Sequence, residues 1–356
     1  MYRKAKNLTK VLMIGPDRSV HGGISAVVNN YYEAGLNQKV DLCYIGTMVE
    51  GSKLRKLWQA IKAFVQFCVK LPEYGIVHIH VASDSSFYRK SVFIKTAHVF
   101  GKRIVVHQHG GNFEEFYYRQ LTEKGRKNVQ KVLSMAEVLL VLSLEWKQFF
   151  SQITEESRIT VFPNSIQLPQ LAEKHYGQHK LLFLGRLCET KGIRELLNSV
   201  AELRSEYPDM KLYLGGIWEE KELETLAGAY PENVRYLGWI NGEEKKKYLE
   251  ECDIFVLPTY FEGQPVSVLE AMAFSCAVVA SQVGGIPQMI EDGQTGILIK
   301  PKDEVSLQDG LLKVLKDARL CAELGANARK KVASEFSIEM SIEKLLQIYR
   351  KVSEVS

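Results

Sequence analysis

Short, nearly continuous apolar runs alternate with amphipathic helical patterns along the whole chain, and this alternation constrains the fold more than any other feature. Runs rich in Val, Ile and Leu without polar alternation are typical of strands buried on both faces of a parallel sheet. The runs lie at 10–15, 76–81, 103–109, 137–143, 180–185, 211–216, 234–238, 253–258, 277–281 and 296–299. Helical patterns separate them, and their main ranges are 24–34, 54–71, 88–100, 191–205, 243–251, 265–274 and 304–316. The sequence therefore predicts an α/β fold with right-handed crossovers.

The length of 356 residues suits two domains better than one core. The stretch 163–180 contains two prolines and little periodicity, so it is interpreted as the linker. We expect two doubly wound Rossmann-like domains over 1–168 and 169–336, and a C-terminal helix over 337–356 that packs back on the first domain. Folds of this class bind ligands at the carboxyl ends of their strands, which predicts a site in a cleft between the domains.

Composition excludes several classes of protein. A net charge of +4 is too mild for a dedicated nucleic-acid-binding protein. The six cysteines are scattered without a C-x-x-C pair, which indicates reduced core residues. No stretch approaches the roughly 20 apolar residues that a membrane span requires. The sequence therefore predicts a cytoplasmic protein.

The segment "LFLGRLCETKGIRELL" places two cations between a predicted strand and a predicted helix. Arg186 follows the strand directly, and Lys191 precedes the helix. Two cations near a helix N-terminus favour an anion site, because the helix dipole and the free N–H groups add to the side-chain charges. The alternative is a pair of solvated surface cations, which is the usual state of Lys and Arg.

The segment "YFEGQPVSVLEAM" carries two glutamates eight positions apart. Glu262 lies in a predicted loop, and Glu270 lies in the predicted helix 265–274. A carboxylate at position 270 can accept two hydrogen bonds from a vicinal diol such as a ribose. The alternative is a glutamate that complements the helix dipole, which explains Glu270 but explains Glu262 poorly.

Gly22 and Gly23 follow the first predicted strand and precede a helical pattern. Glycines let a backbone approach a phosphate or a sugar closely, although a tight turn explains many glycine pairs. The spacing fits neither a P-loop nor a dinucleotide fingerprint, so a nucleoside triphosphatase and a Rossmann dehydrogenase are disfavoured.

Four histidines form two H-x-H pairs at the ends of two predicted strands. Residues i and i+2 of a strand share a face, so a metal site is conceivable. No Asp or Glu accompanies them at a familiar ligand spacing, and hydrogen-bonded core histidines are the favoured interpretation. The four residues are His78, His80, His107 and His109.

Together these motifs resemble glycosyltransferase family 4, whose members are retaining enzymes with the two-domain GT-B fold. The Glu262 and Glu270 spacing fits the family's E-x7-E pattern, and 262–299 is similar to its C-terminal signature. "HGGISAVV" resembles the family's glycine loop and "GRLCETKG" its phosphate clamp. "VHIHVASDSSFYRK" and "VVHQHGGNFEEFY" resemble the subgroup that acts on bacterial exopolysaccharides and related surface glycans.

The resemblance implies a role for each matching residue. Arg186 and Lys191 would bind the diphosphate of a nucleotide-sugar donor, Glu270 its ribose, and Glu262 its sugar. His109 would lie beside the donor sugar. Further donor contacts are implied for Gly22, Gly23, Ile240, Gly263, Gln264, Val266 and Ser267. Pro265 stands where the family usually has the second residue of a Phe-Gly pair, and it has no N–H to donate.

The resemblance implies sugar transfer from a donor, with UDP as the expected carrier, to a glycan or lipid-linked saccharide in bacterial surface polysaccharide synthesis. No D-x-D motif is present, so we expect no metal and no other cofactor. Arg186, Lys191 and the helix N-termini would then stabilise the leaving diphosphate. The alternatives are a sugar-nucleotide hydrolase or a non-hydrolysing epimerase, which need no acceptor, and a subunit that only binds nucleotide.

The segment 52–71 predicts an amphipathic helix with an apolar stripe and several lysines and arginines. One interpretation is a helix whose apolar stripe faces the core. The other is contact with the anionic inner face of the plasma membrane, where a lipid-linked acceptor would lie. The stripe comprises Leu54, Leu57, Trp58, Ile61, Phe64, Val65 and Cys68.

Overall fold

A computed structural model describes residues 8–171 and 173–354, and the chain divides into two compact units. Unit 1 comprises Met1–Gln167 and Ile338–Ser356, and unit 2 comprises Leu168–Ser337. The C-terminal helix predicted over 337–356 therefore groups with the first unit. Each unit is described by itself.

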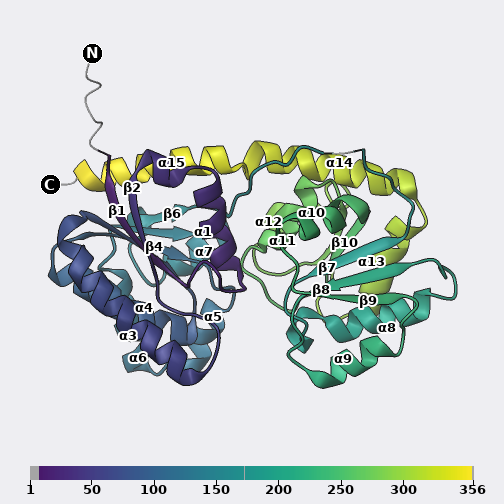
Figure 1. The fold of residues 1–356 in the computed structure, drawn as a ribbon, viewed down its shortest axis with the longest axis horizontal. Helices are drawn as coiled ribbons and strands as arrows, with labels where there is room; N and C mark the ends of the chain where they lie inside the picture. Colours follow the sequence, from purple (N-terminus) through teal and green to yellow (C-terminus); the bar gives the residue numbers. More distant parts are fainter. Residues whose placement is uncertain (1–7, 172, 355–356) are drawn as a thin grey trace, which may run out of the picture. The chain divides into compact units, whose positions relative to one another are not determined.

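Unit 1 contains one parallel six-stranded sheet with the order β2-β1-β3-β4-β5-β6 (Figure 1). The direction of strand addition reverses between β1 and β3. Ligands of doubly wound folds bind beyond the carboxyl ends of strands at such a reversal. The strands are β1 (Lys10–Gly15), β2 (Asp41–Gly46), β3 (Ile76–Val81), β4 (Arg103–Gln108), β5 (Val138–Val141) and β6 (Ile159–Val161).

Helices cover both faces of this sheet, with α3, α4 and α6 on one face and α1 and α15 on the other (Figure 1). The α-helices are α1 (Gly23–Glu33), α2 (Leu36–Lys39), α3 (Lys53–Lys70), α4 (Asp84–Val99), α5 (Phe113–Glu115), α6 (Glu123–Leu133), α7 (Leu144–Phe150) and α15 (Ile338–Glu354). Short helical turns are η1 (Leu71–Glu73), η2 (Phe116–Gln120) and η3 (Glu156–Arg158).

Unit 2 has a second parallel six-stranded sheet with the order β12-β11-β10-β7-β8-β9. Its direction reverses between β7 and β10, which are neighbours. The strands are β7 (Lys180–Leu184), β8 (Lys211–Gly215), β9 (Val234–Gly238), β10 (Ile254–Leu257), β11 (Ala277–Ser281) and β12 (Ile297–Ile299).

The helices of unit 2 also lie on both sides of its sheet, with α8, α9 and α13 on one side and α10, α11 and α14 on the other (Figure 1). They are η4 (Glu189–Lys191), α8 (Ile193–Leu203), α9 (Lys221–Gly228), α10 (Gly242–Glu251), α11 (Val266–Ala273), α12 (Ile286–Met289), α13 (Glu304–Leu315) and α14 (Ala318–Glu335). The apolar runs form the core as expected, since β10 and β11 are buried along their whole lengths.

The prediction of an α/β fold with two Rossmann-like sheets is confirmed, and all ten expected strands are present with ends shifted by up to two residues. Two strands were missed. β2 is only partly buried over most of its length, and β6 is three residues long, so neither shows a continuous apolar run. Helix α4 begins at Asp84 rather than at 88, because small polar residues form its first turn.

The core-facing interpretation of the 52–71 stripe is wrong for every stripe residue except Phe64, which packs against the core. Helix α3 buries only Ala63 and Phe67. It packs on α4 through contacts of Phe64 and Phe67 with Phe93, at ring-centroid distances of 5.5 and 5.0 Å. The exposed large apolar residues of α3 are Leu54, Leu57, Trp58, Ile61, Val65 and Val69. We call this set the α3 apolar face.

Two further expectations concern cysteines and membrane spans. Cys188, Cys252, Cys276 and Cys321 are buried and unpaired, as expected, whereas Cys43 is partly buried and Cys68 is exposed. Within 8–171 and 173–354, no helix has both the length and the apolar character needed to cross a bilayer.

Candidate active site

The reversal of the unit 2 sheet gathers most of the predicted site residues. Arg186 and Lys191 follow β7, and Glu262 follows the adjacent strand β10. Glu270 lies on α11, the helix that follows β10. Because β7 and β10 are parallel neighbours, the segments after both strands emerge at the same edge of the sheet.

A glycine allows the β7 and β10 segments to approach each other. Gly192 has φ +70°, and a Cβ there would overlap the carbonyl of Pro258. Tyr260 N donates to Thr190 O at 3.0 Å, which ties the turn before Gly192 to the segment after β10. Only glycine combines this left-handed backbone with so close a contact. The packing therefore fixes Lys191 opposite the loop that carries Glu262.

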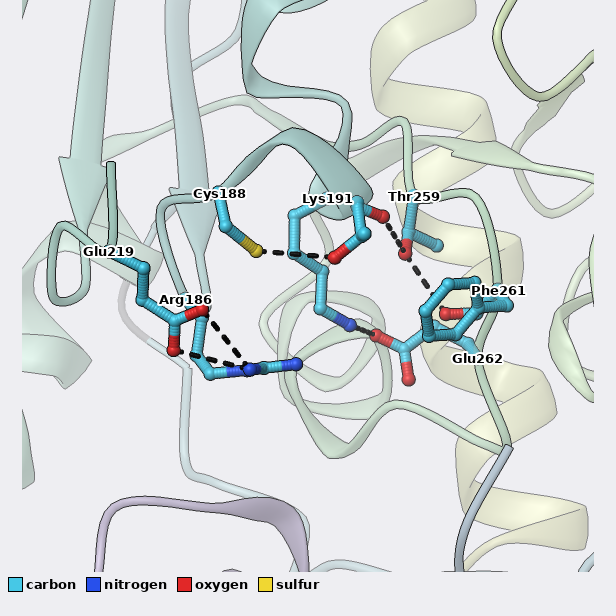
Figure 2. Close-up of polar contacts among 8 residues, drawn as sticks. Arg186, Cys188, Lys191, Glu219, Thr259, Phe261 and Glu262 are labelled. Atoms are coloured by element: carbon cyan, nitrogen blue, oxygen red, sulfur yellow. Dashed lines mark hydrogen bonds and ion pairs between the residues drawn. The ribbon is translucent and has the colours of Figure 1, made fainter. Parts of the chain in front are cut away.

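Lys191 and Glu262 form an ion pair that is largely shielded from water. Lys191 Nζ donates to Glu262 Oε1, and the two side chains are 13% and 19% exposed. Figure 2 shows the two side chains directed at each other from the two facing segments. The structure therefore brings together a carboxylate and a cation to which sequence analysis gave separate roles.

The loop that carries Glu262 is held by two glycines after β11. Gly284 has φ +52°, and a Cβ there would overlap the carbonyl of Glu262. Gly285 N donates to Gly263 O at 2.6 Å. These backbone contacts hold the loop backbone at Glu262 and Gly263 against the segment after β11.

Glu270 lies in the second turn of α11 and pairs with a lysine from α10. Lys245 Nζ donates to Glu270 Oε1 at 2.6 Å, and the Glu270 side chain is 18% exposed. This partner was missed, because Lys245 lies in the run "EEKKKYLEE" that looks like a solvated helix face. A simple dipole role fits poorly, since Glu270 is not in the first turn of its helix.

Arg186 is the most exposed member of the set. Its Nη1 contacts both carboxylate oxygens of Glu219 at 3.2 Å, and the Arg186 side chain is 55% exposed (Figure 2). An exposed pair of this kind contributes about 0–1 kcal/mol, so it can open readily. Glu219, which follows β8, was also missed by sequence analysis.

The N-terminus of α11 supplies backbone donors beside this set. Val268 N and Leu269 N both donate to Pro265 O, at 3.2 and 3.4 Å. The amides of Val266 and Ser267 precede them in the first turn, where a helix offers no acceptor. The remaining predicted residues Ile240, Gly263 and Gln264 are buried in the same unit.

Gly22 and Gly23 lie in unit 1 at the N-terminus of α1. A Cβ at either position would meet no other atom within 4 Å. Packing therefore does not require glycine there, and the backbone is open to an approaching group.

His109 also belongs to unit 1, where it follows β4. Its Nε2 is 2.8 Å from His80 Nδ1, and desolvation lowers the pKa of His109 to about 3. A neutral imidazole at this position can accept or donate a hydrogen bond without adding a charge.

Three more imidazoles lie behind His109 and are fully buried. His78 Nδ1 is 2.6 Å from the Tyr349 hydroxyl of α15, and burial lowers the pKa of His78 to about 3. His78, His80 and His107 offer ring nitrogens that all lie within 4.8 Å of one another. No carboxylate belongs to this group within the described parts of the chain. The sequence analysis expected no metal, and this stays a prediction.

Comparisons with known proteins find a family match within unit 2. Residues 169–331 match the family described as glycosyl transferases group 1. The amylovoran biosynthesis glycosyltransferase AmsK of Erwinia amylovora is 27% identical over 268 residues, which is 71% of this chain and 65% of AmsK. The capsular polysaccharide biosynthesis glycosyltransferase CapM of Staphylococcus aureus is 28% identical over 229 residues, or 58% of this chain and 59% of CapM. The chain thus matches less than two thirds of either relative.

Solved structures resemble the chain over nearly its whole length. Sucrose-phosphate synthase from Thermosynechococcus elongatus has a TM-score of 0.82 at 20% identity, covering 98% of this chain and 100% of that one. Anabaena HepE in complex with UDP-glucose has a TM-score of 0.75 at 16% identity, covering 96% and 99%. These similarities show that the chain has the GT-B fold.

Proposed function

We propose that the chain is a retaining glycosyltransferase of the family 4 type, and that it transfers a sugar from a UDP-sugar to a saccharide acceptor. The observation that carries this proposal is the shielded Lys191–Glu262 pair at the β7/β10 reversal, with Arg186 and Glu270 on the flanking segments. A diphosphate needs cations and a sugar needs hydroxyl acceptors, and this edge of the sheet offers both.

In the proposed donor complex, Arg186 and Lys191 bind the diphosphate and Glu270 accepts hydrogen bonds from the ribose. Glu262, released from Lys191, binds hydroxyls of the donor sugar. The amides of Val266 and Ser267, and those of Gly263 and Gln264, lie beside the sugar, with Ile240 near the base. The donor contacts that the resemblance implies for Gly22, Gly23 and His109 of unit 1 stay predictions. Each charged group therefore exchanges a protein partner for a donor partner.

The proposed chemistry needs no metal. The bond between the anomeric carbon and the diphosphate oxygen breaks, and a bond from the acceptor hydroxyl oxygen to that carbon forms on the same face. The acceptor proton passes to a phosphate oxygen of the departing UDP. Arg186 and Lys191 stabilise the negative charge that develops on the diphosphate, a type of contribution worth several kcal/mol in other enzymes.

The acceptor is proposed to be a lipid-linked saccharide in bacterial surface polysaccharide synthesis. Support comes from the similarity to CapM and from the α3 apolar face, where Leu54 and Trp58 are 79% and 68% exposed. Lysines and arginines flank these side chains on the same helix. An apolar face edged by cations suits the surface of an anionic membrane, so we propose peripheral contact at the inner leaflet.

The donor proposal is tested by thermal shift against UDP-, GDP-, ADP- and TDP-sugars, followed by NMR of the product formed with an acceptor extract. We expect selective stabilisation by one UDP-sugar and an anomeric configuration equal to that of the donor. An inverted product would refute retention. Donor turnover without acceptor, at the same rate as with it, would instead favour the hydrolase or epimerase.

The membrane proposal is tested by flotation with vesicles containing anionic lipid. Replacing Lys53, Arg55, Lys56 and Lys62 with alanine should abolish capture, and the protein with its natural sequence should bind neutral vesicles weakly. Undiminished capture of the variant would reject the contact, whatever the enzyme transfers.

A further inference from the structure

Helix α4 carries two adjacent cations near the carboxyl edge of the unit 1 sheet. Lys90 is only 2% exposed, and its Nζ donates to Thr47 Oγ1. Thr47 follows β2, and its hydroxyl donates in turn to Gly15 O, the last residue of β1, at 2.9 Å. The ammonium group therefore lies beyond the ends of β1 and β2, beside the reversal of the unit 1 sheet.

Neither cation has a counterion among the residues that the structure describes. Within the described residues, Lys90 has one hydrogen-bond partner, Thr47, and no carboxylate pairs with Lys90 or Arg89. Arg89 is half-buried, and its Nε is buried without an acceptor. Burial lowers the pKa of both side chains, and the charge of Arg89 lowers the pKa of Lys90 further.

Such an arrangement is costly if it serves only packing. A buried ammonium group without a counterion is among the most unfavourable groups in a protein interior. Methionine would fill a similar volume at no electrostatic cost. Within the described residues, Lys90 Nζ has one acceptor, Thr47, and the Arg89 Nε donor has none, so a group with several negative oxygens would complete the arrangement.

We propose that Arg89 and Lys90 bind the phosphoryl group of a diphosphate-linked acceptor. The identification of this ligand as the acceptor rests on the proposed function. Unit 2 has its own cations for the nucleotide diphosphate, so this second pair in unit 1 suits a different diphosphate. The α3 apolar face belongs to the same unit as Lys90, which fits an acceptor whose diphosphate is attached to a hydrocarbon chain.

Binding exchanges one partner for another. The flexible stem of Lys90 lets the ammonium leave Thr47 and turn toward the incoming oxygens, while Arg89 already reaches the surface. Guanidinium and ammonium donors then satisfy two or more phosphoryl oxygens. Thr47 keeps its hydrogen bond to Gly15 O, so the end of β1 stays fixed.

The test measures binding of geranyl diphosphate to the full chain by calorimetry, with saturating UDP present so that the nucleotide site is occupied. Lys90→Met should weaken binding at least tenfold, and Arg89→Gln should also weaken it. Lys95→Met is the matched control, because Lys95 is an exposed lysine on the same helix that bonds Asn128 at 3.0 Å. Equal affinity of the Lys90 and Lys95 variants would overturn the proposal.

Three ligand arms separate the phosphoryl group from the chain that carries it. Inorganic pyrophosphate should bind more weakly than geranyl diphosphate but show the same dependence on Lys90, and geraniol should show none. A Lys90 dependence that is equal for geraniol would refute phosphoryl recognition. If inorganic pyrophosphate binds as tightly as geranyl diphosphate, the site recognises a free inorganic anion. This result would overturn the assignment to a lipid-linked acceptor.

Thermal unfolding provides a second readout that a purely structural role would not reproduce. Without ligand, Lys90→Met should unfold at the same temperature as the natural sequence or higher, because a buried charge is removed. A large drop would indicate that Lys90 serves packing and would refute the inference. UDP affinity should be unchanged in this variant. If the protein with its natural sequence does not bind UDP, the proposed donor is refuted, but the proposed phosphoryl site at Arg89 and Lys90 is not.

Discussion

The two units share a sheet architecture but carry opposite chemistry at the carboxyl edges of their sheets. In unit 2 the site charges are matched, since Lys191 pairs with Glu262, Lys245 with Glu270 and Arg186 with Glu219. In unit 1 the corresponding edge holds neutral imidazoles and the unmatched Lys90. The contrast shows that sheet topology determines where a ligand can bind, whereas the pairing of side-chain charges determines which charge the ligand must carry. We therefore expect a ligand of unit 2 to replace the side-chain partners of these charged groups, and a ligand of unit 1 to supply a negative charge.

The largest effect is expected from Lys191→Met. If the matched charges of unit 2 serve the leaving diphosphate, kcat should fall about 100- to 1,000-fold, as when a preorganised transition-state donor is removed elsewhere. The free energy of unfolding should change by less than about 2 kcal/mol. Steady-state kinetics and chemical denaturation measure the two quantities.

Lys246→Met is the control for this prediction, because Lys246 lies in unit 2 and its ion pairs with Glu243 and Glu250 are long, at 4.0 Å each. If Lys191→Met destabilised the protein while leaving kcat intact, the comparison between the units would be refuted. The Lys191–Glu262 ion pair would then serve stability rather than catalysis.

The next effect concerns Glu270. Glu270→Ala should raise the Kd for UDP about 100-fold or more, since two charge-assisted hydrogen bonds of about 1.5–3 kcal/mol each would be lost. Calorimetric titration with UDP checks this. Lys245→Met separates the two roles of the carboxylate, because it removes the ion pair but keeps the proposed ribose acceptor. Equal losses of UDP affinity in both variants would show that UDP binding depends on the Lys245–Glu270 ion pair rather than on the ribose contact.

Acid should affect unit 1 more than unit 2. The folded-state pKa values of His78 and His109 are lowered by burial to about 3, below the usual 6.5, and those of His80 and His107 are also lowered. Between about pH 6.5 and 3 the unfolded chain therefore binds more protons than the native one. Stability is full above 6.5 and falls as the pH decreases, by up to about 1.4 kcal/mol per pH unit for each histidine.

Hydrogen exchange at pH 7 and pH 5 measures this difference by unit. Amides of β3 and β4 should lose protection relative to those of β7 and β10, and His107→Phe should reduce the loss. Equal losses of protection in the two sheets would remove this distinction between the units.

The smallest effect is expected within unit 1 itself. Trp58→Ser should change the free energy of unfolding by less than about 0.5 kcal/mol, because the side chain is 68% exposed. Phe67→Ala, on the buried side of the same helix, should cost about 3–5 kcal/mol. Denaturant titration of both variants checks this. A large loss for Trp58→Ser would mean that the α3 apolar face packs against protein.

The sequence predicted the sheets well because buried parallel strands carry an unmistakable apolar pattern. It failed where that pattern is absent, as in the half-buried strand β2. The resemblance also implied contacts of Arg186, Lys191 and Glu262 with one donor, and the structure places these residues after the adjacent strands β7 and β10. The sequence could not predict that Lys191 pairs with Glu262, or that Lys245 reaches Glu270, because side-chain pairing depends on distances across elements. The exposure of Trp58 was equally hidden, since periodicity defines an apolar stripe but not the direction in which it faces.

Unit 1 is assembled from two parts of the chain that are separated by all of unit 2. Tyr349 of α15 is fully buried and bonded to His78, 271 positions earlier. During synthesis, residues 8–167 leave the ribosome before α15 can pack on them, whereas unit 2 leaves the ribosome as one continuous segment. Nascent chains should accordingly acquire a protease-resistant second half before the first half is complete.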